Sequence, residues 1–322
     1  MNKKSILSFV LALIVCVFCA FTIVPHLRVK NTLHTIIIDA GHGGPDHGAK
    51  GKYSDEASLN LQLALKLGKK LQEALPDCKI VYTRTDENLP GNLTNKNVAN
   101  RLRAKIANEA KGDLFIAIHV NSMPDRYRKV REGTREETYY TYKGKGRKKK
   151  KIEHTRTVPN YVNVKIPETI SGTETYIWAT GKNDSKKQFV RNESEDMGGG
   201  ELSSTDEKYF ESPEAKIFAS IKTKQYFENS KMIAQFVEDE LSQSGRPTWG
   251  VKQRDYEGIW VLQATAMPSI LVETGFICTP SDEDYLNSAA GQDQITESIK
   301  NAVVKYKTTL ESKSESRSTK TD

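Results

Sequence analysis

The chain of 322 residues contains few cysteines and, beyond its first 30 residues, no long apolar run. Two of its four cysteines, Cys16 and Cys19, lie inside an apolar segment at positions 6–24 that follows a short basic start. This layout predicts a signal peptide or an N-terminal anchor over residues 1–30, and hence an exported protein, with a buried core helix as the alternative. The C-x-x-C spacing inside such a leader is therefore not a redox or metal-binding motif.

The composition of the remaining chain sets broad limits on its structure and partners. Only Cys78 and Cys278 remain; they could pair in an oxidising compartment, although nothing in the sequence shows that they do. The net charge of +7 favours anionic partners without identifying one. With 37% hydrophobic residues, the chain can form a core in one large domain or two small ones.

Strand-like and helix-like patterns alternate along most of the chain. We expect strands at residues 36–38, 79–83, 114–118, 173–178 and 268–273, and helices at residues 54–75, 95–110, 184–197, 230–244 and 293–310. This alternation predicts an α/β fold, with a twisted, mostly parallel sheet flanked by helices on both faces. We assign the folded domain to residues 31–310 and expect the polar tail at 311–322 to be disordered.

Two polar insertions interrupt this pattern, at about residues 124–169 and 181–213. The first is basic and rich in tyrosine, and includes the run KGKGRKKKK at residues 143–151. A solvated loop is the simplest interpretation of such a run, and binding of an anionic polymer is the alternative. The nearby aromatic residues Tyr139, Tyr140 and Tyr142 would also suit single-stranded nucleic acid, but export of the protein argues against a nucleic-acid partner.

Three residues with ligating or catalytic side chains follow predicted strands: His42, His119 and Glu273. In open parallel α/β sheets, functional sites form in the crevice at the carboxyl ends of the strands. Glu56 begins the helix after the His42 loop, so it can face the same crevice, or it can simply complement the helix dipole. These residues are the candidates for a functional site.

Two imidazoles and one carboxylate, with a fourth position left open, form a typical catalytic zinc site. Zinc would lower the pKa of a bound water towards about 7 and polarise a substrate carbonyl. A carboxylate that does not bind the metal must then accept the proton of that water and pass it to the leaving amine, and Glu273 can fill this role. His47 is a rival ligand to His42, although it lies inside a turn, where no strand end fixes its direction.

Several ordered motifs together resemble one known family. They are DAGHGG at residues 39–44, Glu56 at the start of a leucine-striped helix, IHVNS at 118–122 and LVETGF at 271–276. They are similar to the motifs of the zinc-dependent N-acetylmuramoyl-L-alanine amidases of the amidase-3 type, which are bacterial cell-wall hydrolases. The resemblance covers most of residues 35–310 apart from the two insertions.

The resemblance implies one Zn²⁺ per chain, held by His42, Glu56 and His119, with Glu273 as the catalytic carboxylate. It implies that Asn121 contacts the metal ligands or the substrate. The substrate would be the amide that joins N-acetylmuramic acid to L-alanine in peptidoglycan. The activity would serve cell-wall remodelling or daughter-cell separation, in the periplasm or cell envelope.

The second insertion falls where the division-associated amidases of Gram-negative bacteria carry a helix that plugs the site. Residues 189–196 loosely resemble that helix, which suggests that Glu193 or Glu195 occupies the open zinc position until an activator protein of the envelope displaces the segment. A surface loop without regulatory meaning is the alternative. Two other function classes stay open: an envelope protein that binds peptidoglycan without turnover, and a zinc peptidase that cuts within the stem peptide.

Overall fold

The computed structural model describes residues 32–318, except positions 180, 182, 185, 189, 191–212 and 255–258. The expected leader at 1–30 and the two proposed plug residues, Glu193 and Glu195, therefore lie outside the described residues. Residues 33–309 form one compact unit. No helix in the described part of the chain is long and apolar enough to cross a membrane.

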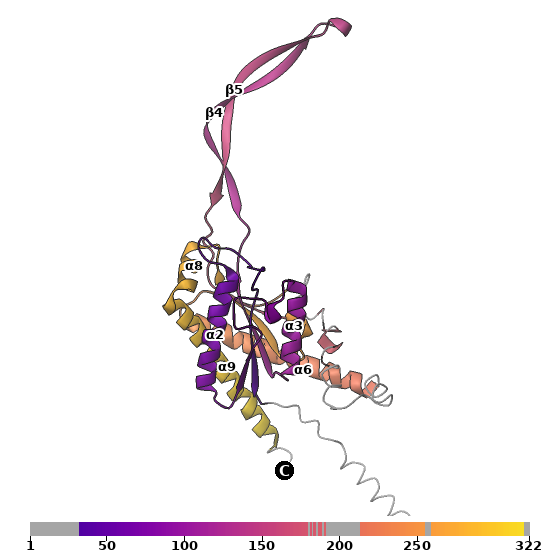
Figure 1. The fold of residues 1–322 in the computed structure, drawn as a ribbon, viewed down its shortest axis with the longest axis vertical. Coiled ribbons are helices and arrows are strands. Elements are labelled where there is room, and N and C mark those ends of the chain that lie inside the picture. Colours follow the sequence, from indigo (N-terminus) through magenta and orange to yellow (C-terminus); the bar gives the residue numbers. More distant parts are fainter. Residues whose placement is uncertain are drawn as a thin grey trace, which may run out of the picture. The chain divides into compact units, whose positions relative to one another are not determined.

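The centre of this unit is a six-stranded sheet with the strand order β2-β1-β3-β8-β6-β7 (Figure 1). Its strands are β1 (Thr35–Ala40), β2 (Lys79–Tyr82), β3 (Leu114–Asn121), β6 (Thr173–Ile177), β7 (Thr248–Gln253) and β8 (Ser269–Phe276). Strands β2, β1, β3 and β8 are parallel, whereas β6 is antiparallel to β8 and pairs in parallel with β7. The predicted mostly parallel sheet is confirmed, and the half-exposed edge strand β7 is an addition to it.

Helices cover both faces of the sheet because successive strand residues point to opposite sides. The helices are α2 (Glu56–Ala74), α3 (Lys96–Glu109), α6 (Pro213–Gln243), α7 (Trp260–Ala264), α8 (Pro280–Asn287) and α9 (Ala289–Ser318). Residues of α3, α6 and α7 pack with Ile37, Phe115 and Leu271 on one face. Helix α2 contacts β1 and β3, and Lys70 on α2 forms an ion pair with Asp293 on α9.

The leucine stripe of the first predicted helix is the buried face of α2. Asp55 is its N-cap and accepts a hydrogen bond from Ser58 N at 2.9 Å, which satisfies a backbone donor that the first turn leaves unpaired. The leucines at positions 59, 63, 67 and 71 are all buried. This packing fixes the start of α2, and with it Glu56, beside the carboxyl end of β1.

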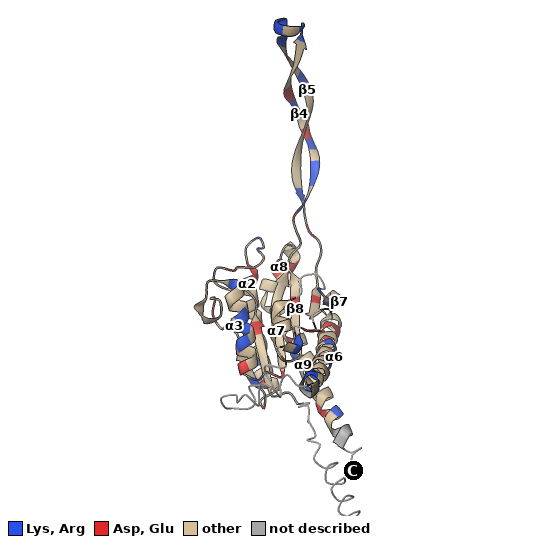
Figure 2. Ribbon diagram, turned by 90° about the vertical axis from the view of Figure 1, so that its right-hand side faces the viewer, with Lys and Arg blue, Asp and Glu red and all other residues tan. Residues whose placement is uncertain are grey.

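The first insertion is not the loop that we expected. Its residues form two long antiparallel strands, β4 (Arg126–Lys143) and β5 (Lys150–Ile166), joined through a short 3₁₀ turn, η2 (Gly146–Lys148). In Figures 1 and 2 this hairpin is a twisted ribbon separate from the six-stranded sheet. The prediction was wrong because both faces of the ribbon are exposed, so the apolar alternation that marks a half-buried strand is absent.

Two other expectations about helices are also corrected. Helix α9 runs from Ala289 to Ser318, beyond the predicted bounds 293–310. The disorder expected of the tail at 311–322 stays a prediction. Helix α6 begins at Pro213 rather than at residue 230. The described residues between positions 183 and 190 are helical, as predicted for the start of the 184–197 segment; residues 191–197 lie outside the described chain.

The two cysteines of the domain make separate contacts. Cys278 carries a free thiol whose sulfur accepts a hydrogen bond from Met123 N at 3.2 Å. The thiol of Cys78 donates to Leu33 O, also at 3.2 Å. The disulfide that an oxidising compartment would permit is therefore not formed in this structure.

Candidate metal centre

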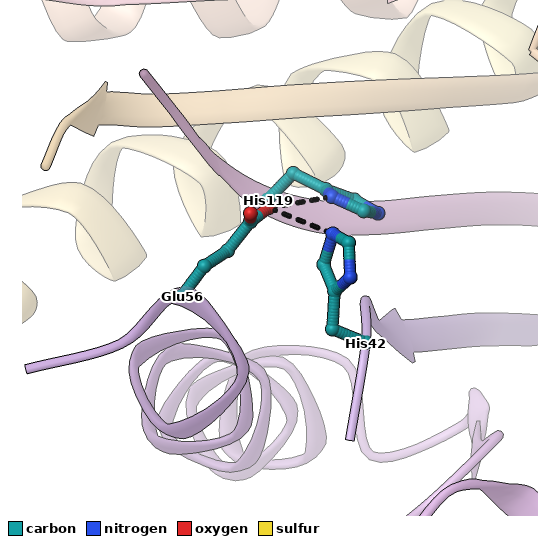
Figure 3. Close-up of side chains that lie close together, drawn as sticks. All are labelled: His42, Glu56 and His119. Atoms are coloured by element: carbon teal, nitrogen blue, oxygen red, sulfur yellow. Dashed lines mark hydrogen bonds and ion pairs between the residues drawn. The ribbon is translucent and has the colours of Figure 1, made fainter. Parts of the chain in front are cut away.

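Three side chains from different elements meet at the carboxyl edge of the parallel strands (Figure 3). His42 follows β1, Glu56 is the first residue of α2, and His119 lies near the end of β3. Glu56 Oε1 lies 3.2 Å from His42 Nε2 and 2.9 Å from His119 Nδ1. One ligand atom from each side chain lies within 4.8 Å of the others, so a single ion could contact all three.

Backbone conformation brings the two imidazoles together. His42 has φ of 61°, in the left-handed region, and follows a glycine. A Cβ atom at Gly41 would lie 2.2 Å from His119 Nε2, so only glycine leaves room for that ring. The two rings meet edge to face with centroids 5.0 Å apart. The glycines of the DAGHGG motif thus explain how the two histidines can share one site.

Two buried arginines hold the turn that carries His42. Arg103 forms an ion pair with Asp39 and donates hydrogen bonds to the carbonyls of Ala40 (2.7 Å) and His42 (2.6 Å). Arg84 donates to the same Ala40 carbonyl at 2.9 Å. We did not predict either arginine from the sequence. The one indication was for Arg103, which lies on an otherwise apolar face of its helix. Hydrogen bonds from the two arginines to the carbonyls of Ala40 and His42 hold the backbone of the turn before and at His42.

Glu56 is buried, yet it carries negative charge. Burial by itself would raise its pKa, but hydrogen bonds with His119 and His42 hold the pKa well below its ordinary range. The backbone amides of Val120 (3.2 Å) and Ala49 (2.8 Å) also donate to its carboxylate. The cluster therefore has a fixed carboxylate between two imidazoles, an arrangement suited to a cation.

The imidazole of His42 has carboxylates on both sides. Its Nδ1 lies 3.0 Å from Asp46 Oδ2, opposite the nitrogen that approaches Glu56. Burial lowers the pKa of His42, but Glu56 and Asp46 outweigh that effect and raise it above its ordinary value. The ring thus has Nε2 in the cluster and Nδ1 close to a carboxylate, a placement common for metal-binding histidines.

Glu273 lies next to the cluster without being part of it. It sits on β8 in register with His119 of β3, and only 6% of it is exposed. Burial raises its pKa to about 7. Its Oε2 is buried without a hydrogen-bond partner among the described residues, and its Oε1 lies 3.5 Å from Arg254 Nη2. A buried carboxyl group with a pKa near neutrality and a spare oxygen is suited to proton transfer.

These side chains line one cleft of about 660 Å³. Its walls include the three cluster residues together with Asn121, Glu273 and Trp260. The Asn121 amide donates to Glu174 Oε2 of β6 at 3.1 Å. Asn121 therefore lines the cleft, and its contact with the metal ligands or the substrate stays a prediction.

His47 is not a member of the cluster. Its Nδ1 lies 3.5 Å from Asp55 Oδ2, and its side chain is 52% exposed. The next residue, Gly48, packs against Glu56, where a Cβ atom would lie 2.5 Å from Glu56 Oε2. Of the two rival histidines in this loop, the structure brings His42 to Glu56 and His119.

The described start of the second insertion is anchored at the opposite end of β8. Lys186 is fully buried and donates hydrogen bonds to Leu262 O (2.7 Å), Met267 O (3.0 Å) and Ser269 Oγ (3.2 Å). Ser269 begins β8, whereas Glu273 lies four residues further along that strand. The described start of the insertion is therefore fixed to the start of β8 and to α7.

Comparisons with known proteins identify the family of this chain. The family model described as N-acetylmuramoyl-L-alanine amidase matches residues 36–305. A germination-specific N-acetylmuramoyl-L-alanine amidase of Bacillus subtilis is 23% identical, over 84% of this chain and 78% of its own. The N-acetylmuramoyl-L-alanine amidase AmiC of Escherichia coli O6:H1 is 25% identical, over 84% of this chain and 52% of its own.

A similar fold is found in the crystal structure of N-acetylmuramoyl-L-alanine amidase from Clostridium difficile 630. It is 24% identical, covers 85% of this chain and 97% of its own, and has a TM-score of 0.50. At this identity the likeness bears on the fold alone, which is the same α/β arrangement. The matched region of the family model includes both histidines, Glu56 and Glu273. The chain therefore belongs to the N-acetylmuramoyl-L-alanine amidase family.

Proposed function

We propose that the protein is a zinc-dependent enzyme that hydrolyses the amide between N-acetylmuramic acid and L-alanine in peptidoglycan, in cell-wall remodelling or daughter-cell separation. The observation that carries this proposal is the convergence of His42, Glu56 and His119 in one cleft, with the buried Glu273 beside them. Family membership supplies the substrate class. The cluster supplies the chemistry.

The three side chains fit a zinc ion. Two imidazole nitrogens and one carboxylate oxygen are the kinds of donor that zinc prefers at catalytic sites with an open position. The carboxylate of Glu56 is already held in its charged form, as a metal ligand must be. When bound, zinc would activate a water molecule and polarise the substrate carbonyl.

Glu273 has the role of proton carrier in this proposal. With a pKa near 7, its carboxylate accepts a proton from the attacking water and delivers it to the amine of the leaving L-alanine. Its buried, unpartnered Oε2 is the atom available for this transfer. Arg254, whose guanidinium lies 3.5 Å from the carboxylate, favours the charged form. Asn121 on the cleft wall would contact the substrate.

We further propose that the second insertion regulates access to the cleft. In this hypothesis Glu193 or Glu195 occupies the open metal position until an envelope activator displaces the segment. Lys186 anchors the beginning of the insertion to the start of β8, so a plug would have to be formed by the residues that follow. Deleting residues 181–200 should raise basal hydrolysis by the purified protein, and unchanged hydrolysis would contradict regulation by this insertion.

The proposed function also places the protein outside the cytoplasm. Peptidoglycan lies in the cell envelope, and a leader over residues 1–30 would export the domain at 31–310, to the periplasm or to the envelope with the leader as an anchor. Detecting the N-terminus of the mature protein in fractionated cells would test this placement. An uncleaved protein in the cytosolic fraction would contradict it.

The direct test of the activity uses purified sacculi. Wild-type protein should release free stem peptides, and a chelator should stop the release until Zn²⁺ is added back. The variant His119→Ala should lose bound zinc and activity, whereas the matched variant His47→Ala should keep both, because His47 lies outside the cluster. Release that is insensitive to chelation would overturn the zinc assignment.

Mass analysis of the fragments separates the two other function classes. Intact stem peptides that begin with L-alanine support the amidase. Fragments cut within the stem would indicate a peptidase, and the absence of any release by zinc-loaded protein without the 181–200 segment would indicate a binding protein.

A further inference from the structure

The β4–β5 hairpin concentrates the positive charge of the protein. Residues 126–166 contain fourteen Lys and Arg against four Asp and Glu, a net charge of +10. The whole chain has a net charge of +7, so everything outside the hairpin sums to −3. Figure 2 shows basic residues along the ribbon and at its tip. An anionic partner would therefore be attracted to the hairpin rather than to the α/β body.

The tip of the hairpin is basic without compensation. Seven of the nine residues from 143 to 151 are Lys or Arg, none is acidic, and all nine are exposed. Lys151 Nζ lies 3.4 Å from the ring centroid of Tyr140, and Lys149 Nζ lies 5.1 Å from that of Tyr142. These cation–π contacts hold lysine side chains along the ribbon, so less side-chain entropy is lost when they bind an anion.

The base of the hairpin is held by ion pairs near the cleft. Arg126 binds Glu168 through two nitrogens, at 2.8 and 2.9 Å, and Lys165 pairs with Asp125 at 2.6 Å. The buried carboxylate of Glu168 fixes this junction. Strand β4 begins five residues after Asn121, which lines the cleft. The ribbon thus starts from the same edge of the sheet as the candidate metal centre.

We propose that the basic tip at residues 143–151 binds the carboxylate groups of peptidoglycan stem peptides and so retains the polymer beside the cleft. This inference rests on the proposed function, because it takes the bound polymer to be the substrate. A polymer that carries carboxylates at regular intervals can engage several lysines at once. Each ion pair is weak by itself, but several formed together bind the polymer more tightly.

The start of the ribbon at the cleft edge favours the substrate polymer over a membrane or nucleic acid. The tip lies a full 18-residue strand away from this edge, so it is a long polymer, and not a small ligand, that can be held at the tip while another part of it enters the cleft. A lipid surface would use the same charges, but the nine tip residues are only Lys, Arg and Gly, and the exposed Tyr140 and Tyr142 beside them already contact Lys151 and Lys149. The favoured partner is therefore the acidic peptide of the cell wall.

The test measures binding of the full chain to purified sacculi in the presence of a chelator, which separates binding from turnover. The variant K148Q/K149Q/K150Q/K151Q removes four tip charges. K69Q/K105Q/K224Q/K231Q removes four charges from exposed lysines of α2, α3 and α6, as a matched control. Changing the same four tip lysines to arginine keeps the charge and serves as the rescue.

The tip variant should bind sacculi at least about fivefold more weakly at low salt, because four exposed charge contacts are lost. The control and the arginine variant should bind like the wild type. Equal weakening by tip and control variants would overturn the inference, since only total charge would then matter. A tip variant that binds sacculi normally but loses binding to anionic phospholipid vesicles or to DNA would overturn it as well.

Hydrolysis of a soluble muramoyl-peptide monomer distinguishes failure of this inference from failure of the proposed function. Tip variant and wild type should cleave the monomer at equal rates, while the tip variant should cleave sacculi with a raised KM. If zinc-loaded protein without residues 181–200 leaves the monomer intact, the proposed function fails. If the monomer is cleaved and the KM for sacculi is unchanged, only the role of the hairpin fails.

Discussion

The six-stranded sheet and the β4–β5 hairpin are both regular β structure, but different forces hold them. Every residue of β8 is buried, whereas almost every residue of β4 is exposed. The sheet is stabilised mainly by removal of apolar surface from water. The hairpin relies on backbone hydrogen bonds and cross-strand side-chain pairs. The candidate site residues therefore lie at the edge of the sheet, where packing fixes their positions. The basic residues that need access to solvent lie on the ribbon.

Two ion pairs between an arginine and a carboxylate show the same contrast, because one is buried and the other is exposed. Arg103 and Asp39 form an ion pair with side chains no more than 2% exposed, beneath the turn of His42. Arg156 and Glu137 form an ion pair across the hairpin, with side chains 60% and 38% exposed. Removing one partner leaves an uncompensated buried charge in the first case and a solvated charge in the second.

The largest effect is expected at the catalytic carboxylate of the sheet. Glu273→Gln should lower kcat/KM for sacculi by about 10²–10⁴-fold, the usual contribution of a general acid–base residue. Zinc content should stay the same, because Glu273 is not in the ligand cluster. Metal analysis of the purified variant provides the control. Near-normal turnover by this variant would show that another group carries the proton.

The next largest effect is expected on stability, at the buried ion pair of Arg103 and Asp39. Arg103→Met should lower the free energy of unfolding by about 3–5 kcal/mol, because Asp39 loses its buried partner. Lys105→Met on the same helix is the matched control; its side chain is 66% exposed, and it should change stability by about 0.5 kcal/mol at most. Denaturant unfolding of both variants gives the comparison, and equal losses would contradict the role of burial.

The raised pKa of Glu273 predicts a pH-dependent stability in the chelated protein. Burial raises this pKa from 4.5 to about 7, so between these values the folded state binds more protons than the unfolded state. The contribution of Glu273 to wild-type stability should therefore fall as the pH rises from 4.5 to 7. Glu273→Gln removes this loss and should be more stable than wild type by about 3 kcal/mol at pH 8, but not at pH 4. A stability difference that does not vary with pH would contradict the shift.

The smallest effect is expected in the hairpin. Arg156→Ala should lower the free energy of unfolding by less than about 1 kcal/mol, because its ion pair with Glu137 is exposed and screened. Thermal unfolding followed at high and low salt would measure it. A loss as large as that of Arg103→Met would mean that hairpin and sheet unfold as one unit, and the contrast between the two regions would fail.

Much of the fold was predictable because its elements are strongly patterned. The apolar run around Ile37 and the leucine stripe around Leu63 predicted a buried strand and an amphipathic helix, and the structure contains both. The hairpin was not predictable in this way. Neither of its faces is buried, so its strands carry no periodic signal and resemble a charged loop. The long extent of α6 was missed for a related reason, because much of its first half is exposed.

The sequence by itself determined which side chains are available at the carboxyl edge, since strand patterns end at His42, His119 and Glu273. Only the tertiary structure decided between His42 and His47, because both lie in one polar loop and direction depends on the backbone. It also showed the support from Arg84 and Arg103, whose contacts join residues more than 40 positions apart. Local sequence patterns report local periodicity, whereas burial and charge pairing depend on which distant segments meet.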